Sequence, residues 1–144
     1  ADALMRMIDI SLDDEPSDHM QAILQPEEVQ QIIMLIQGVV IATPLKQSAV
    51  DLVLATHPGG PANKSVASRH FRYGASPRGL QALLRMARVR AVLQGRAHVD
   101  VDDIFHVALP VFRHRVLLNI ESELEGVDVD GALSEILGQW RSCH

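Results

Sequence analysis

The chain has 144 residues, of which 47% are hydrophobic and only 3% aromatic, and its formal net charge is −5. This length suffices for one domain with a core that needs no disulfide or metal, and the shortage of aromatic residues favours packed helices. The negative charge argues against a dedicated nucleic-acid-binding protein, because such a protein needs clustered lysines and arginines to neutralise phosphates. The single cysteine, Cys143, has no partner in the chain, which indicates a reducing, cytoplasmic setting.

The most apolar stretch, residues 32–42, is too short to insert into a membrane. It is about half the roughly 20 residues that span a bilayer, and Gln37 interrupts it. We therefore expect a core helix there and no membrane insertion. No signal sequence opens the chain, and its first residue is Ala1 rather than methionine, which indicates that something upstream has been removed. We expect residues 1–23 to be a connector and residues 24–144 to be the folded domain.

The first two helices are expected in the first half of that domain. One begins at Pro26, whose fixed φ suits the first helical position, and its apolar residues recur at helical spacing. The next covers residues 46–57, and the run of proline and glycine after His57 ends it. Its buried face should comprise Leu45, Ala49, Leu52, Val53 and Thr56. Residues 59–68 then predict an irregular loop, and the alternating residues 70–73 permit a short extended segment.

The longest helix is expected to begin at Pro77 and to end at Gly95, with Ser76 as its N-cap. Successive helical residues lie about 100° apart, so its arginines and one glutamine share a stripe. Apolar residues flank that stripe on both sides, and we expect both flanks to be buried with a basic ridge between them. The ridge comprises Arg78, Gln81, Arg85 and Arg88.

Two further helices complete the prediction. Asp100 caps the fourth, which begins at Val101 and should be kinked by Pro110. A linker around Gly126 leads to the last helix, whose expected buried face is Val129, Leu133, Ile136, Leu137 and Trp140. The sequence therefore predicts an all-α helical bundle of about five helices with one irregular loop.

The turn before the longest helix has the chemistry of an anion site. Gly74 permits close backbone approach, the Ser76 hydroxyl can cap the helix, and Pro77 presets its first turn, which leaves free N–H groups. Arg78 opposes the helix dipole at a cost of about 0.3 to 1 kcal/mol, which an anionic ligand would offset. Arginines near helix starts are also common on ordinary surfaces, and Arg85 and Arg88 fit a solvated face at least as well as a ligand-binding ridge.

A set of motifs around this helix resembles the lid domain of MoxR-type AAA+ ATPases. The set comprises Gly-Ala-Ser-Pro-Arg at 74–78, the helix that follows it to Gly95-Arg96, the step at 99–104 and Leu-Pro-Val-Phe-Arg-His-Arg at 109–115. The resemblance covers most of residues 24–140. It implies that Arg78 is the sensor 2 arginine, which reaches the nucleotide phosphates from the lid. The turn that faces the nucleotide would be shaped by Gly74, Ala75, Ser76 and Pro77.

The resemblance also implies partners outside this chain. An upstream ATPase core would hold ATP with Mg²⁺, and residues 1–23 would connect to it. The intact protein would form a homo-oligomeric ring and carry out chaperone-like remodelling of partner proteins, often ones with a von Willebrand factor A domain. The chain has no Gly-x-x-x-x-Gly-Lys-Ser/Thr phosphate loop and no parallel-sheet pattern with a Mg²⁺-binding acid, so we expect it to be inactive alone.

The alternative is a free-standing helical interaction module whose basic ridge, with Arg85 and Arg88, binds an acidic partner.

Other polar groups have structural explanations. His106 and His114 are separated by Pro110, and no cysteine or histidine pair has zinc-finger spacing, so we expect no metal site. Ser76 is explained as a cap rather than a nucleophile. Aspartates at 100, 102 and 103 fit capping and the dipole of a helix start, and the glutamates at 121, 123 and 125 fit a solvated run.

Overall fold

A computed structural model describes Met5, residues 22–59 and residues 65–143. The chain divides into two units, Ala1–Ile33 and Met34–His144, and all of the buried core lies in the second. Apart from Met5, Ala22 and Ile23, the expected connector lies outside the described residues. In the described residues no helix is both long and apolar enough to cross a membrane.

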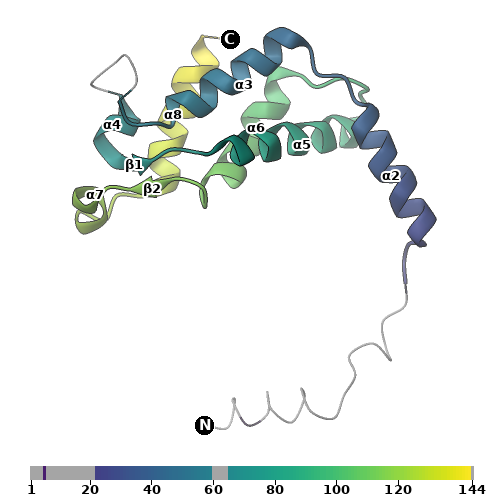
Figure 1. The fold of residues 1–144 in the computed structure, drawn as a ribbon, viewed down its shortest axis with the longest axis horizontal. Helices are drawn as coiled ribbons and strands as arrows, with labels where there is room; N and C mark the ends of the chain where they lie inside the picture. The colour runs from purple at the N-terminus through teal and green to yellow at the C-terminus, as the bar shows by residue number, and fades with distance from the viewer. Residues whose placement is uncertain (1–4, 6–21, 60–64, 144) are drawn as a thin grey trace. The chain divides into compact units, whose positions relative to one another are not determined.

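Seven helices and one small sheet make up the described part of the chain, which is all-α as predicted (Figure 1). Five helices are long, in agreement with the sequence, and two have only five residues each. The bounds are α2 Pro26–Gly38, α3 Thr43–Ala55, α4 Val66–His70, β1 Phe71–Tyr73, α5 Pro77–Leu93, α6 Val101–Phe112, β2 Leu117–Leu118, α7 Ile120–Leu124 and α8 Val129–Ser142.

The two short helices and the second strand lie where the sequence predicted no regular element. Helix α4 occupies the end of the expected irregular loop, and the Ser65 hydroxyl caps it by accepting from the N–H of Ser68 at 3.1 Å. The predicted extended segment is confirmed as β1, which pairs antiparallel with β2 through Phe71 and Leu118. The partner strand was not predicted, because two residues carry no alternating pattern.

Helix α2 begins at Pro26 as predicted, but none of its residues is buried, so the expected core helix is wrong. Its apolar residues recur at helical spacing, which predicts a helix but does not predict whether another element packs against its apolar face.

Val40 lies just after the end of α2. Its N–H donates to Ala97 O at 3.1 Å and its carbonyl accepts from Val99 N at 3.0 Å, which makes an isolated parallel bridge.

The core is built by α3, α5, α6 and α8. The expected face of α3 is confirmed as buried, and that of α8 is confirmed except for Val129, which is half-buried. Trp140 on α8 lies against α3, where its indole N–H donates to Ser48 O at 2.9 Å. Along α5 the buried residues follow every fourth position: Gly79, Leu83, Ala87 and Ala91. This side has three small residues, which let α6 approach closely.

Only one flank of α5 is buried, which corrects the prediction of two. Met86 and Leu93 on the second flank are 45% and 77% exposed. The helix ends as expected, with Gly95 in the left-handed region at φ +70°. Ala82 and Val89 on the second flank are half-buried, so among the described residues this flank is only partly covered.

The connection from α5 to α6 is closed by a buried carboxylate. Asp103 has no exposed surface and accepts from Arg96 at 2.6 and 2.8 Å and from the N–H of Asp100 at 2.9 Å. Arg90 lies 3.7 Å away. Asp100 and Asp103 thus form the capping box of α6, so the structural interpretation of these aspartates is confirmed. Burial alone would raise the pKa of Asp103, but the bonds from Arg96 and Asp100 outweigh it and lower that pKa.

Replacing Asp103 with asparagine should destabilise the fold strongly. The substitution leaves Arg96 without its charged partner at a position where its side chain is only 29% exposed. We expect a loss of about 2 to 4 kcal/mol in the free energy of unfolding, measured by urea denaturation. Asp102→Asn in the same helical turn is the matched control. Its ion pair with Arg141 is exposed, so it should cost less than about 1 kcal/mol, and equal costs would contradict the assignment.

The lowered pKa of Asp103 also predicts the pH at which this contribution disappears. A carboxylate with a lowered folded-state pKa stabilises fully above its unfolded pKa of about 3.9 and loses that contribution as the pH falls through the folded-state value. The stability difference between the wild-type chain and Asp103→Asn should therefore be constant from about pH 5 to 8 and shrink below about pH 4. Urea denaturation along a pH series measures it, and a difference that fades near neutral pH would contradict it.

Candidate functional site

The turn that precedes α5 is anchored to the end of α3. The Thr56 hydroxyl donates to Val53 O at 2.6 Å and accepts from the N–H of Ala75 at 2.9 Å. His57 Nε2 lies 2.9 Å from Ala75 O. Both backbone polar groups of Ala75 are thus held by adjacent residues of one helix end. Because Thr56 and Ala75 are both fully buried, this anchor fixes where the first turn of α5 begins.

Gly74 is required by the closeness of this contact. A Cβ added there would lie 2.6 Å from the backbone oxygen of Thr56 and 2.8 Å from Cδ2 of His57. The backbone of Thr56 cannot give way as a flexible side chain could, so residue 74 must lack a side chain. Gly74 was predicted to permit close backbone approach, and the backbone that it approaches is that of Thr56, at the end of α3.

Ser76 stands at the N-cap of α5 as predicted, but its hydroxyl makes no capping hydrogen bond. Its backbone carbonyl instead accepts from Gly79 N at 2.7 Å and from Leu80 N at 3.2 Å. Pro77 has no N–H, and the N–H of Arg78 has no acceptor among the described residues. The exposed Ser76 hydroxyl and the Arg78 N–H are therefore both available at the helix start.

The arginines of the ridge differ from most others in the chain. Arg78 and Arg85 are exposed and have no hydrogen-bond or ion-pair partner among the described residues, and Arg88 is half-buried with its Nε unsatisfied. Five arginines elsewhere contact a carboxylate: Arg69, Arg90, Arg96, Arg113 and Arg141. The ridge thus presents cations that the described chain does not neutralise, and this is the property expected of an anion-facing surface.

The free donors and the cation at the start of α5 suit an anionic ligand. In the described residues no group of three or more histidine, cysteine, aspartate or glutamate side chains could hold a metal ion. Four of the described histidines have hydrogen-bond partners: His57 with Ala75 O, His70 with Ser122 Oγ, His106 with Asp102 O, and His114 with Arg115. What the structure brings together is therefore an exposed cation and free donors at the mouth of one helix.

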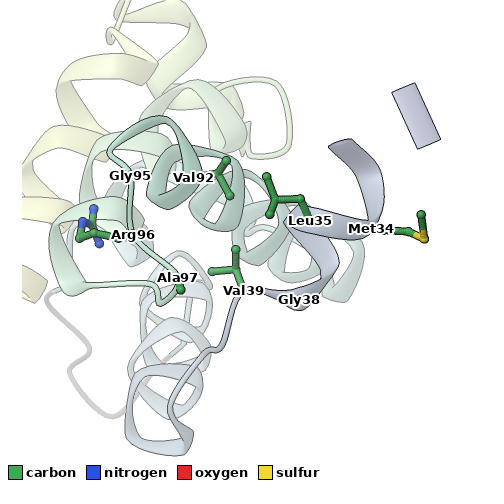
Figure 2. Close-up of a pocket in the computed structure, with 8 residues that line it drawn as sticks. All are labelled: Met34, Leu35, Gly38, Val39, Val92, Gly95, Arg96 and Ala97. Atoms are coloured by element: carbon green, nitrogen blue, oxygen red, sulfur yellow. The ribbon is translucent and has the colours of Figure 1, made fainter. Parts of the chain in front are cut away.

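A separate apolar hollow of about 450 Å³ lies at the other end of α5 (Figure 2). Leu35 points toward Val92 across it, whereas Met34 points away from both. Its one charged residue, Arg96, is committed to Asp103. Val92, its residue on α5, lies fourteen residues after Arg78, which is about 21 Å along the helix at a rise of 1.5 Å per residue, so the hollow is distinct from the ridge start.

Sequence reasoning missed the anchor of the turn. Thr56 was assigned to a buried face, and a buried hydroxyl needs a hydrogen-bond partner. That requirement was visible in the sequence, but the partner, nineteen residues further along, was not.

The model of the AAA lid domain family matches residues 63–136, just over half of the chain, which includes the turn before α5 and the ridge but not Thr56 and His57. The chain belongs to the AAA lid domain family. Its curated relatives include "Protein MoxR" of Paracoccus denitrificans, 47% identical over 53 residues (37% of this chain and 16% of that protein), and "Protein MoxR" of Methylorubrum extorquens, 33% identical over 112 residues (74% and 33%).

The lid is also similar to the "Uncharacterized protein YeaC" of Bacillus subtilis, 27% identical over 124 residues (85% of this chain and 35% of that protein). A crystal structure of a Cytophaga hutchinsonii protein described as a candidate ATPase matches with a TM-score of 0.76 and 27% identity, covering 94% of this chain and 41% of that one. The lid is thus of the MoxR type, and it spans about a third of the length of two of these relatives.

Thr56→Val should loosen the turn of the lid while preserving its shape. The valine methyl groups fill the space of threonine, but the buried N–H of Ala75 loses its acceptor, which should cost about 1 to 3 kcal/mol in unfolding free energy. Hydrogen exchange should accelerate at the Ala75 amide. Thr43→Val, at the exposed start of α3, is the control and should leave both quantities unchanged. Unaltered exchange at Ala75 in Thr56→Val would show that the anchor is not needed.

Proposed function

We propose that this lid contributes a sensor arginine, Arg78, to the ATP site of a MoxR-type AAA+ ATPase. The single observation that supports it best is the state of Arg78, an exposed cation in the first turn of α5 with no partner among the described residues. Held against the helix dipole, such a cation costs free energy in the isolated lid. A polyphosphate brought to the helix start by another domain would offset that cost with charge-assisted hydrogen bonds.

The residues at the helix start fit this ligand. The Arg78 guanidinium and N–H and the Ser76 hydroxyl are free donors, and no acidic residue lies between Phe71 and Leu93 to repel phosphate. Gly74, Ala75, Ser76 and Pro77 would form the turn that faces the nucleotide. Mg²⁺ and the phosphate cradle would come from the ATPase core, because the chain has no phosphate loop. The lid alone should therefore bind no metal at this turn and hydrolyse no ATP.

The anchor at Thr56 supports a role in transmitting the nucleotide state. Because α3 holds the turn and α6 packs along α5, a movement of Arg78 would carry the helices of the lid with it. In the intact protein this would couple ATP binding and hydrolysis to assembly of a homo-oligomeric ring in the cytoplasm. The same coupling would drive chaperone-like remodelling of partner proteins, of which a von Willebrand factor A domain protein is one type.

Arg78→Ala in the intact ATPase should lower ATP turnover by about 10- to 1000-fold, the range for removing one preorganised charge from a reacting phosphate or oxyanion. Steady-state hydrolysis and nucleotide-dependent assembly, measured by sedimentation, test it. Lys46→Ala is a matched control, because Lys46 is also an exposed cation at a helix start with a preceding proline. It should leave turnover and assembly unchanged.

The fold must be shown to survive the substitution. Arg78 contacts no described residue through a hydrogen bond or ion pair, so Arg78→Ala should unfold in urea within about 0.5 kcal/mol of the wild type. If turnover and assembly both equal those of the wild type, Arg78 is not the sensor residue.

A further inference from the structure

A groove of about 420 Å³ lies between α5 and α6, two helical turns beyond Arg78. Arg85 and Met86 of α5 line one side, Pro110 and Val111 of α6 line the other, and His114 and Arg115 close it just after α6. No acidic residue lines it. The groove lies on the second flank of α5, which the sequence analysis expected to be buried and which the described residues leave open.

The groove has an apolar floor and a basic rim. Met86 and Val111 supply the floor, and Met86 is half-exposed although its side chain is apolar. Arg85 has no hydrogen-bond or ion-pair partner among the described residues. Arg115 uses only Nη1 in hydrogen bonds, to Val111 O and His114 Nε2. A surface of this kind fits an occupant with an apolar stripe between carboxylates.

The same chain carries such an occupant in α7. Ile120 and Leu124 are 66% and 83% exposed and lie one turn apart on one face of the helix. Glu121, Glu123 and Glu125 are all exposed and project on both sides of that face. Helix α7 therefore presents an apolar stripe between acidic residues, which complements the groove in both charge and hydrophobicity.

We propose that α7 of one copy of this chain docks into the α5–α6 groove of a second copy. Leu124 would lie on Met86 and Val111, while the glutamates beside it would pair with Arg85 and Arg115. In Figure 1 α7 lies beyond the β1–β2 sheet rather than over the α5–α6 pair, so the contact is between molecules. Because the two surfaces differ, it is a heterologous contact, which grows into a ring or an open chain. It does not depend on the proposed role of Arg78.

The contact area is small, because α7 has only five residues. It is well below the roughly 1,200 to 2,000 Å² of a stable interface, so the dissociation constant should fall between about 0.1 and 1 mM. In a ring held by other contacts the local concentration is high, and a weak contact of this kind then acts as an intramolecular one.

The test uses the 144-residue chain and two variants, each of which removes one of the two surfaces. Arg85→Glu damages the groove, and Leu124→Asp damages α7; both residues are exposed, so the fold should be kept. The Met86 methyl NMR signal and sedimentation velocity are followed up to about 1 mM chain. Wild type should show concentration-dependent shifts and larger species, and each variant alone should remain monomeric. Lys46→Glu and Leu54→Asp are exposed controls on α3 and should behave as wild type.

Mixing the two variants gives the decisive result. Leu124→Asp still offers an intact groove and Arg85→Glu still offers an intact α7, so the mixture should form one-to-one dimers and nothing larger. The proposal is overturned if the wild type remains monomeric to about 1 mM, if either variant associates like the wild type, or if the mixture does not associate. A loss of association in the Lys46→Glu control would also overturn it, since the effect would then follow net charge.

Discussion

The hydroxyl of Thr56 joins the end of α3 to the turn that opens α5, and the position of the candidate nucleotide-facing turn depends on it. The hydroxyl uses its donor on Val53 O and its acceptor on the N–H of Ala75, so both polar functions are satisfied without water. Gly74 can lie against the same backbone only because it has no Cβ. Since the bond is fully buried, it is stronger than an exposed one and costly to leave unmade. The turn that precedes Arg78 is therefore held in a fixed position relative to the end of α3.

The other end of α5 is fixed by a different kind of bond. There Asp103 of α6 accepts two hydrogen bonds from Arg96, which follows the Gly95 stop. A hydroxyl thus holds the start of the helix and a buried carboxylate holds its end, while Leu83 and Ala87 pack the middle. A 17-residue helix held at three places along about 26 Å behaves as a rigid rod. The ridge on its open side can then transmit displacement without the helix bending.

The sequence predicted those parts of the fold that depend on local rules. Pro26, Pro77 and Gly95 mark helix ends through their own backbone preferences, and the α8 face follows from the 3.6-residue period alone. The features that it missed are long-range. Periodicity identified α2 as a helix but assigned it wrongly to the core. The Ser76 hydroxyl was expected to cap α5, but the hydrogen bonds there are accepted by the Ser76 carbonyl. Asp103 looked like an ordinary cap residue because its charged partner lies before the helix.

For the site itself, the resemblance predicted a role for the turn and for Arg78, which stays a prediction, and it carried no information about which cations lack a partner. That distinction needs the three-dimensional pairing of charges. In a chain of net charge −5, five arginines contact acids, while the exposed Arg78 and Arg85 contact none in the described residues.

Arg78 and Arg85 are seven residues apart on one stripe of α5, which is about 10 Å along a helix. A neighbour that engaged Arg85 would therefore contact the same rigid rod that carries Arg78. Because free energies of coupled binding are reciprocal, any preference of that neighbour for one lid position would appear equally as a preference of a ligand bound at Arg78. If both proposed contacts form, two unneutralised cations on one helix link the intermolecular contact to the ligand without a separate moving part.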